Sequence, residues 1–175
     1  MTATDAATKT LGTYLNDHLA GAHTGVEMAR KLHDDVAGEP DAATLGTLAK
    51  DIEEDLDTLR ELVDMIGVAS QPVKQAAGWL AEKAQRLGVG QARTGDPHLT
   101  RLLQAETLAL GVEGKLGLWL ALMEVRAGFP PLVAVDLPAL VERARDQRRR
   151  LEEIRLAAVR RAFTDADQPG GAASV

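Results

Sequence analysis

The sequence predicts an all-α protein, a four-helix bundle made of two antiparallel helical hairpins. Hydrophobic residues make up 45% of the 175 residues and aromatic residues only 3%, so Leu, Ala, Val and Ile must supply most of the core. Ala and Leu are strong helix formers, and runs of β-branched residues, which favour strands, are scarce. Proline, glycine and capping residues divide the chain into long segments with helical periodicity.

The first two long helices are separated by a short break. The first is expected at about 6–37, where residues 38–41, Gly-Glu-Pro-Asp, interrupt the helical pattern. The second is expected at about 42–66 and is followed by Gly67, as a glycine commonly follows a helix end. Because the connection is short, the two helices should form an antiparallel hairpin.

The last two long helices begin with similar signals. Asp96 and Pro97 supply an N-cap followed by proline, which predicts a helix at about 97–127. Asp136 opens the final helix, expected at about 137–164. The connection between these helices is again short, so they should form a second antiparallel hairpin.

A long crossover joins the two hairpins. It takes about thirty residues and includes a short helix expected at about 71–87, so it can span the length of a bundle whose helices extend about 30 Å. Trp79 in this helix should pack against the bundle, or else form a dimer contact. Residues 1–167 are expected to form one domain, and residues 168–175, rich in Gly, Ala and Ser, a disordered tail.

The composition excludes several classes of function. A net charge of −6 disfavours nucleic-acid binding, which needs a basic face, and the absence of cysteine excludes disulfides and thiolate chemistry. The first ten residues do not resemble a secretory signal, and the longest apolar run is too short to cross a bilayer. We therefore expect a cytoplasmic protein with no nucleic-acid or membrane partner.

The third long helix places two acids among its apolar residues. Glu106 and Glu113 are seven residues apart on the predicted core stripe, opposite a polar face that carries Arg101, Gln104 and Lys115. The other members of this stripe are Leu99, Leu102, Ala109, Leu116, Leu120 and Met123.

Buried carboxylates need partners, because an unpaired buried charge is costly. His18 on the stripe of the first helix and Gln147 on that of the fourth are candidate partners, so we predict a buried polar cluster of His18, Glu106, Glu113 and Gln147. Two alternatives stay open. The acids could reach solvent at a helix end or groove, or they could form a metal or ligand site.

Four stretches together resemble the ferritin-like family, over most of residues 10–160. They read TYLNDHLAGAHTGVEMARKL, DIEEDLDTLRELVDMIGV, QAETLALGVEGKLGLW and ERARDQRRRLEEIRL. The triplet at residues 25–27, Gly-Val-Glu, recurs at residues 111–113, as in a fold built from two related helix pairs. The resemblance implies a ferritin-like four-helix bundle with the long crossover between its hairpins.

The family's dimetal site would need two single acids and two Glu-x-x-His motifs. Neither Glu-x-x-His motif has its histidine in this chain. Arg149, which cannot bind a metal, stands at the histidine position of the second motif. The stripe of the second helix offers only Leu, Ile and Val, so the site should be degenerate, with no metal cofactor. A di-iron or di-manganese centre using inward carboxylates is the alternative. The candidate ligands are Glu27, Glu54, Asp57, Glu106, Glu113 and Asp146.

Three functions are compatible with these observations. The chain has no catalytic triad order, glycine-rich phosphate loop or paired-histidine zinc motif. The sequence therefore favours a non-enzymatic interaction or scaffold protein, acting as a homodimer. A ferritin-like metal-binding protein or oxidoreductase is the second possibility. The third is a protein that binds a small apolar ligand between its helices.

Overall fold

The computed structural model describes residues 3–36, 38–67 and 96–164, and every regular element in these ranges is helical. The predicted all-α class is therefore confirmed for this part of the chain. The short helix expected at about 71–87, with Trp79, and the tail at 168–175 lie outside the described residues. The elements are α1 (Ala3–Asp34), α2 (Ala42–Ile66), α4 (Pro97–Val125), the 3-10 turn η1 (Arg126–Gly128), α5 (Pro130–Val133) and α6 (Leu137–Phe163).

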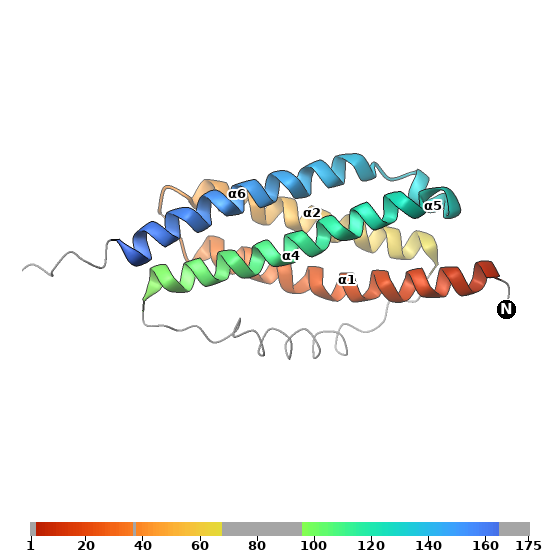
Figure 1. The fold of residues 1–175 in the computed structure, drawn as a ribbon, viewed down its shortest axis with the longest axis horizontal. Coiled ribbons are helices and arrows are strands. Elements are labelled where there is room, and N and C mark those ends of the chain that lie inside the picture. Colours follow the sequence, from red (N-terminus) through yellow and green to blue (C-terminus); the bar gives the residue numbers. More distant parts are fainter. Residues whose placement is uncertain (1–2, 37, 68–95, 165–175) are drawn as a thin grey trace, which may run out of the picture.

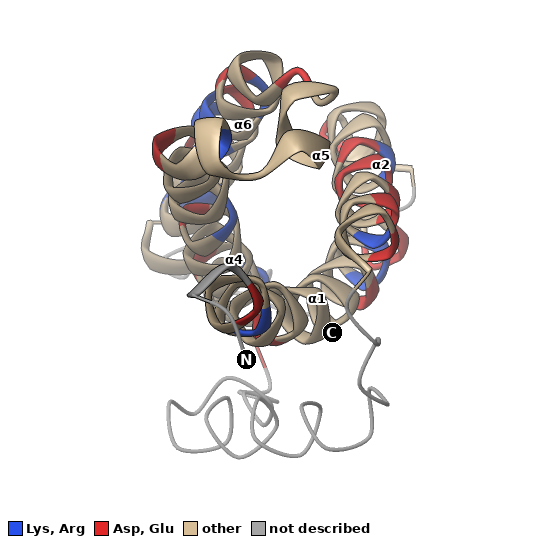
Figure 2. Ribbon diagram, turned by 90° about the vertical axis from the view of Figure 1, so that its right-hand side faces the viewer, with Lys and Arg blue, Asp and Glu red and all other residues tan. Residues whose placement is uncertain are grey.

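The four long helices form a bundle of two antiparallel hairpins (Figure 1). One hairpin contains α1 and α2, and the other contains α4 and α6, while α2 and α4 run in the same direction. Along the bundle axis, the helices surround a common core and the short α5 lies at one end (Figure 2). Helix α1 packs against α4, and α2 lies beside α6, so the two hairpins share one core.

The predicted helix ends are confirmed at three positions. Gly67 ends α2 in the left-handed conformation, with φ of 72°, and its N–H donates to the α2 backbone. The side chain of Asp96 accepts hydrogen bonds from the first N–H groups of α4. The side chain of Asp136 does the same for the Ala139 N–H at 3.1 Å in α6. These caps satisfy groups that a helix terminus leaves without partners.

The apolar stripes predicted for α1, α2 and α6 form most of the core. All seven stripe residues of α6 are buried, including the polar Gln147, which is fully enclosed. Of the predicted stripe residues of α2, only Ile66 at the helix end is half-buried rather than buried. Of those of α1, His18 and Ala22 are half-buried. The remaining residues of these stripes lie in one continuous apolar core.

The stripe predicted for α4 is only partly correct. Leu102 and Leu116 are buried as predicted, but Glu106, Glu113, Leu120 and Met123 are exposed, so the buried face is rotated relative to the predicted one. Helix α4 carries apolar residues on all sides, so two rotations fit its hydrophobic pattern, and the alternative one is realised. Its buried residues are Arg101, Leu102, Ala105, Leu108, Val112, Leu116, Leu118, Trp119 and Leu122.

Candidate functional site

The two acids of α4 face solvent rather than the core. The Glu106 side chain is 45% exposed and lies 3.7 Å from Arg155 of α6. The Glu113 side chain is 55% exposed and lies 2.7 Å from Arg148 of α6. The prediction that both are buried is therefore wrong, because arginines on the neighbouring helix neutralise them at the surface.

The predicted buried polar cluster consequently does not form. His18 is half-buried and packs its ring edge-on against Tyr14, with ring centroids 4.6 Å apart. Burial lowers the pKa of His18, and the nearby Asp17 partly opposes this shift. Gln147 is buried as predicted, but its partners are Lys115, which was expected on the polar face of its helix, and Asp55.

Two basic residues occupy the buried face of α4 instead. The Arg101 side chain is only 8% exposed and donates two hydrogen bonds to Glu39, at 2.6 and 2.5 Å. This bidentate pair ties the start of α4 to the connection between α1 and α2. Lys115, the second basic residue, is almost enclosed in the middle of the bundle. Long basic side chains tolerate such positions, because their aliphatic stems pack against apolar neighbours.

Lys115 belongs to a cluster that joins three helices. Asp55 of α2, whose side chain is 1% exposed, forms an ion pair through Oδ2 with Lys115 of α4. Gln147 of α6 bridges both, since its Nε2 donates to Asp55 Oδ2 at 2.9 Å and its Oε1 accepts from Lys115 Nζ at 2.5 Å. Arg143 of α6 meets Asp55 Oδ1 as an ion pair without hydrogen-bond geometry. We call these four residues the buried ionic cluster.

The buried ionic cluster is electropositive. One negative charge on Asp55 against the positive charges of Lys115 and Arg143 leaves a net charge of +1. Glu54, at the surface, takes up part of the Arg143 charge at 3.2 Å. Burial lowers the pKa of Lys115, and the adjacent Asp55 carboxylate opposes this shift only in part.

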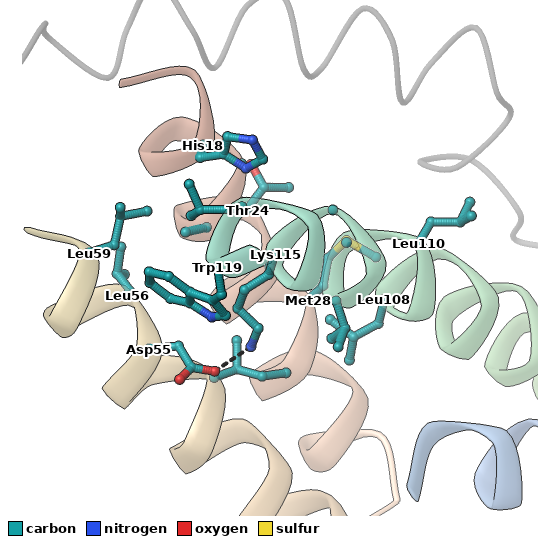
Figure 3. A pocket seen from close by; sticks show the side chains of 18 of the residues that line it. His18, Thr24, Met28, Asp55, Leu56, Leu59, Leu108, Leu110, Lys115 and Trp119 are labelled. Carbon is teal, nitrogen blue, oxygen red and sulfur yellow. Dashed lines mark hydrogen bonds and ion pairs between the residues drawn. The ribbon is translucent and has the colours of Figure 1, made fainter. Parts of the chain in front are cut away.

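A cavity of about 370 Å³ lies against this cluster, between α1, α2 and α4 (Figure 3). Its walls are mostly aliphatic, and glycines of α1 and α4 line it. A Cβ added at Gly25 of α1 or Gly111 of α4 would meet no heavy atom outside its own helix backbone within 4 Å. The polar residues that line the cavity are Asp17, His18, Thr24, Asp55, Thr107 and Lys115.

Trp119 presents an unused hydrogen-bond donor in the cavity wall. Its side chain is fully buried, and its Nε1 has no acceptor in the described part of the chain. Figure 3 shows the indole nitrogen on the side of the ring that faces the Asp55–Lys115 pair. The cavity therefore combines an apolar wall with donors concentrated at one end.

The candidate metal ligands do not converge. Glu27, Glu54 and Asp57 are exposed, and Asp146 has a largely exposed side chain that pairs with arginines of its own helix. Glu54 also pairs with Arg143, and Asp57 with an arginine one turn along α2. Within residues 3–36, 38–67 and 96–164, no three His, Asp or Glu side chains lie close enough to hold a metal ion. These residues do not fit a dimetal centre.

The helical spacing of Asp55 and Lys115 in the sequence indicates that these two residues of the buried ionic cluster face the core. Asp55 lies three residues after Ile52 and four before Leu59, so it faces the core of α2, and the expectation of no inward acid there was wrong. Lys115 has the same relation to Val112 and Trp119 in α4. Neither residue alone identifies a buried ion pair. A charged residue on a core face becomes a candidate for burial only when a residue of opposite charge is found to face it.

Comparison of the chain with models of protein families, with curated proteins and with solved structures found no match. The ferritin-like resemblance therefore rests on the layout of the sequence. Among the described helices, none combines the length and the apolar character needed to cross a membrane.

Proposed function

We propose that this protein is a non-enzymatic binding protein that holds a small, largely apolar molecule between α1, α2 and α4. The observation that carries the proposal is the cavity of about 370 Å³ beside the buried ionic cluster. Small-molecule sites typically enclose about 300–1,000 Å³ and combine apolar walls with a few polar groups. This cavity has that size and that distribution of groups.

The state of the charged groups supports binding rather than catalysis. Asp55 is held by Lys115, Gln147 and Arg143, so its carboxylate is engaged in contacts between helices rather than directed at a substrate. Lys115 is in turn held by Asp55 and Gln147. Such a cluster fixes the shape of the cavity end, and the aliphatic walls supply the favourable burial of a ligand.

A probe-binding experiment with matched glycine variants tests this function. An apolar fluorescent probe, 1-aminoanthracene, should bind the wild-type chain with a stoichiometry of one. Gly25→Leu and Gly111→Leu should abolish binding, because both side chains would fill the cavity. Gly128→Leu is the control, since Gly128 in η1 is also exposed with open space around it but does not line the cavity. Equal binding by all four proteins would reject the proposal.

We also propose that the protein forms a homodimer, because the outer face of α4 exposes leucines that a second copy could cover. Leu103 and Leu110 are exposed and lie seven residues apart on one line of the helix, which continues to Gly117. Small and aliphatic residues at this spacing allow two helices to pack closely. Light scattering coupled to size-exclusion chromatography should give twice the chain mass, and Leu103→Glu should halve it. A monomeric wild type would remove this candidate.

We also infer a ferritin-like topology for the bundle. The support is the order of the hairpins and the shared direction of α2 and α4 (Figure 1), together with the roughly thirty residues that separate these two helices in the sequence. The degenerate ligand set then fits a relative of that architecture that binds an organic molecule. An experimental structure that traces residues 68–95 along the full length of the bundle would bear out this topology. A short crossover within one end would contradict it.

A further inference from the structure

The end of the cavity beside the buried ionic cluster offers one hydrogen-bond donor without an acceptor in the described part of the chain, Trp119 Nε1, and one donor with a spare N–H, Lys115 Nζ. Trp119 Nε1 is buried and has no partner among the described residues. Lys115 Nζ carries three N–H groups, and the described residues supply acceptors for two of them, Asp55 Oδ2 and Gln147 Oε1. Buried indole N–H groups usually have a partner, so this arrangement points to an acceptor from outside the chain.

The two donors are close enough to act together. Trp119 follows Lys115 by four residues in α4, and side chains at this spacing are neighbours on one face of a helix. Both line the cavity, and Figure 3 shows the indole nitrogen directed to the same end as the Lys115 ammonium. One ligand group with two acceptor oxygens could therefore meet both donors.

The remaining N–H of Lys115 selects the kind of acceptor. The Asp55 carboxylate is already engaged by Lys115 and Arg143, and Arg143 is shared with Glu54. The ammonium of Lys115 is therefore the charged group with an N–H left for a ligand at this end, and it favours an anionic acceptor over a cationic one. Asp17, the other acid of the lining, is exposed.

We propose that the cavity binds a monocarboxylate with an apolar body, whose carboxylate oxygens accept hydrogen bonds from Trp119 Nε1 and Lys115 Nζ. This inference rests on the proposed function and specifies its ligand class. The apolar body lies against the aliphatic walls and occupies the space opposite Gly25 and Gly111. Because the cavity is near the small end of the usual range, a medium-chain aliphatic acid fits better than a long one.

Calorimetric titration with three probes that share one tail separates the headgroup from the apolar body. Decanoate, decan-1-ol and decylamine are titrated into the full chain below their aggregation concentrations. Decanoate should bind with a stoichiometry of one and about tenfold or more tighter than decan-1-ol, because a charged hydrogen bond adds that much affinity. Decylamine should bind most weakly.

Two variants test the assigned donors. Trp119→Phe keeps an aromatic wall but removes the N–H donor together with part of the ring, so both probes gain the same extra space while only decanoate loses a hydrogen bond. The ratio of the decanoate and decan-1-ol affinities should therefore fall towards one. Lys115→Met should have the same effect through loss of charge. If Lys115→Met does not fold, Trp119→Phe still decides the question. An unchanged ratio in Trp119→Phe would overturn the assignment.

A spectroscopic measurement follows the donor itself. In ¹⁵N-labelled protein the indole resonance of Trp119 is identified by its persistence in Trp79→Phe. Decanoate should shift this resonance downfield and slow its exchange with solvent, and Gly111→Leu should prevent both changes.

The outcomes distinguish this inference from the proposed function. Equal binding of the three probes, blocked by Gly111→Leu, would overturn the carboxylate and leave the apolar site standing. Stronger binding of decan-1-ol would assign a neutral hydroxyl ligand and likewise overturn it. No binding of any probe would overturn both proposals.

Discussion

Asp55 of α2 and Lys115 of α4 form a buried ion pair across the bundle, although sixty residues separate them in the chain. Gln147 of α6 bonds to both partners, so three of the four long helices meet at one carboxylate. A buried charge that loses its partner is costly, whereas replacing a whole buried ionic set with apolar residues is often tolerated. The pair therefore contributes more to specifying how the helices meet than to the net stability of the fold.

The first prediction concerns the removal of one partner. Asp55→Leu should lower the free energy of unfolding by about 3–5 kcal/mol, because Lys115 and Arg143 would remain without their counter-charge. Lys115→Met should cost less, since Arg143 still pairs with Asp55. Urea denaturation followed by circular dichroism measures both changes.

The double variant, Asp55→Leu with Lys115→Met, provides the control for this prediction. It should be more stable than the sum of the two single changes implies, because neither charge is then left alone. Strictly additive losses would contradict a direct coupling between these residues.

The second prediction concerns the acids on the surface of α4. Glu106→Gln and Glu113→Gln should each change the free energy of unfolding by less than about 1 kcal/mol, because both pairs with α6 arginines are exposed. Asp55→Asn is the matched comparison, since it also removes a carboxylate charge but from a buried position. A loss at Glu113 as large as that at Asp55 would contradict the exposed placement.

The third prediction concerns the pH dependence of stability. Burial lowers the pKa of His18 in the folded state, so between that value and about 6.5 the unfolded chain binds more protons. The free energy of unfolding should therefore fall as the pH decreases through this window. Denaturation at about pH 7.5 and about pH 5.5 should show a smaller difference in His18→Gln than in wild type.

His23 contributes to the same window and serves as an internal comparison. Burial and the nearby Arg60 lower its pKa, partly opposed by Glu27. The double variant His18→Gln with His23→Gln should show the flattest dependence of the series. An unaltered slope in the double variant would assign the effect to other groups.

The fourth prediction concerns the bidentate pair at the start of α4. Arg101→Met should lower the free energy of unfolding by about 1.5–3 kcal/mol, since two charge-assisted hydrogen bonds to Glu39 are lost. Arg101→Lys should restore little of it, because an ammonium cannot reproduce the planar fork. The exposed Arg60→Met should have little effect on the same denaturation curve.

Acid sensitivity offers a second measurement of this pair. The hydrogen bonds from Arg101 lower the pKa of Glu39 below its usual value of 4.5. The resulting stabilisation is present above 4.5 and is lost as the pH falls through the lower, folded-state value. Acid denaturation of Arg101→Met should therefore depend less on pH in that range. An identical acid transition would show that the pair is not maintained in solution.

The sequence was informative wherever one face of a helix is clearly polar. In α6, arginines and glutamates mark the outer face, so seven of the eight buried positions from Leu137 to Ala158 follow from periodicity alone, Val141 being the exception. The caps at Gly67, Asp96 and Asp136 could also be predicted. Each ends or begins a helix through its own side chain or backbone conformation, which does not depend on contacts from distant residues.

The rotation of α4 could not be predicted in this way. Leu103, Leu110 and Leu120 remain exposed while leucines on the other side are buried, so hydrophobicity does not distinguish the two faces. The decision between them depends on contacts from other helices. Arginines of α6 hold the acids outside, and Asp55 of α2 holds Lys115 inside. Pairings of this kind are not a property of any single segment of sequence.

The cavity has walls of two kinds, and they respond to temperature in opposite directions. Besides Asp17, α1 contributes an apolar stretch of wall formed by Ala22, Gly25 and Met28, and apolar contacts of this kind weaken on cooling. On the far side, Asp55 and Lys115 close the cavity with an ion pair, whose desolvation penalty falls on heating. Cooling should therefore weaken the packing of the apolar wall that α1 provides, whereas heating should lower the desolvation cost of the ion pair between Asp55 and Lys115.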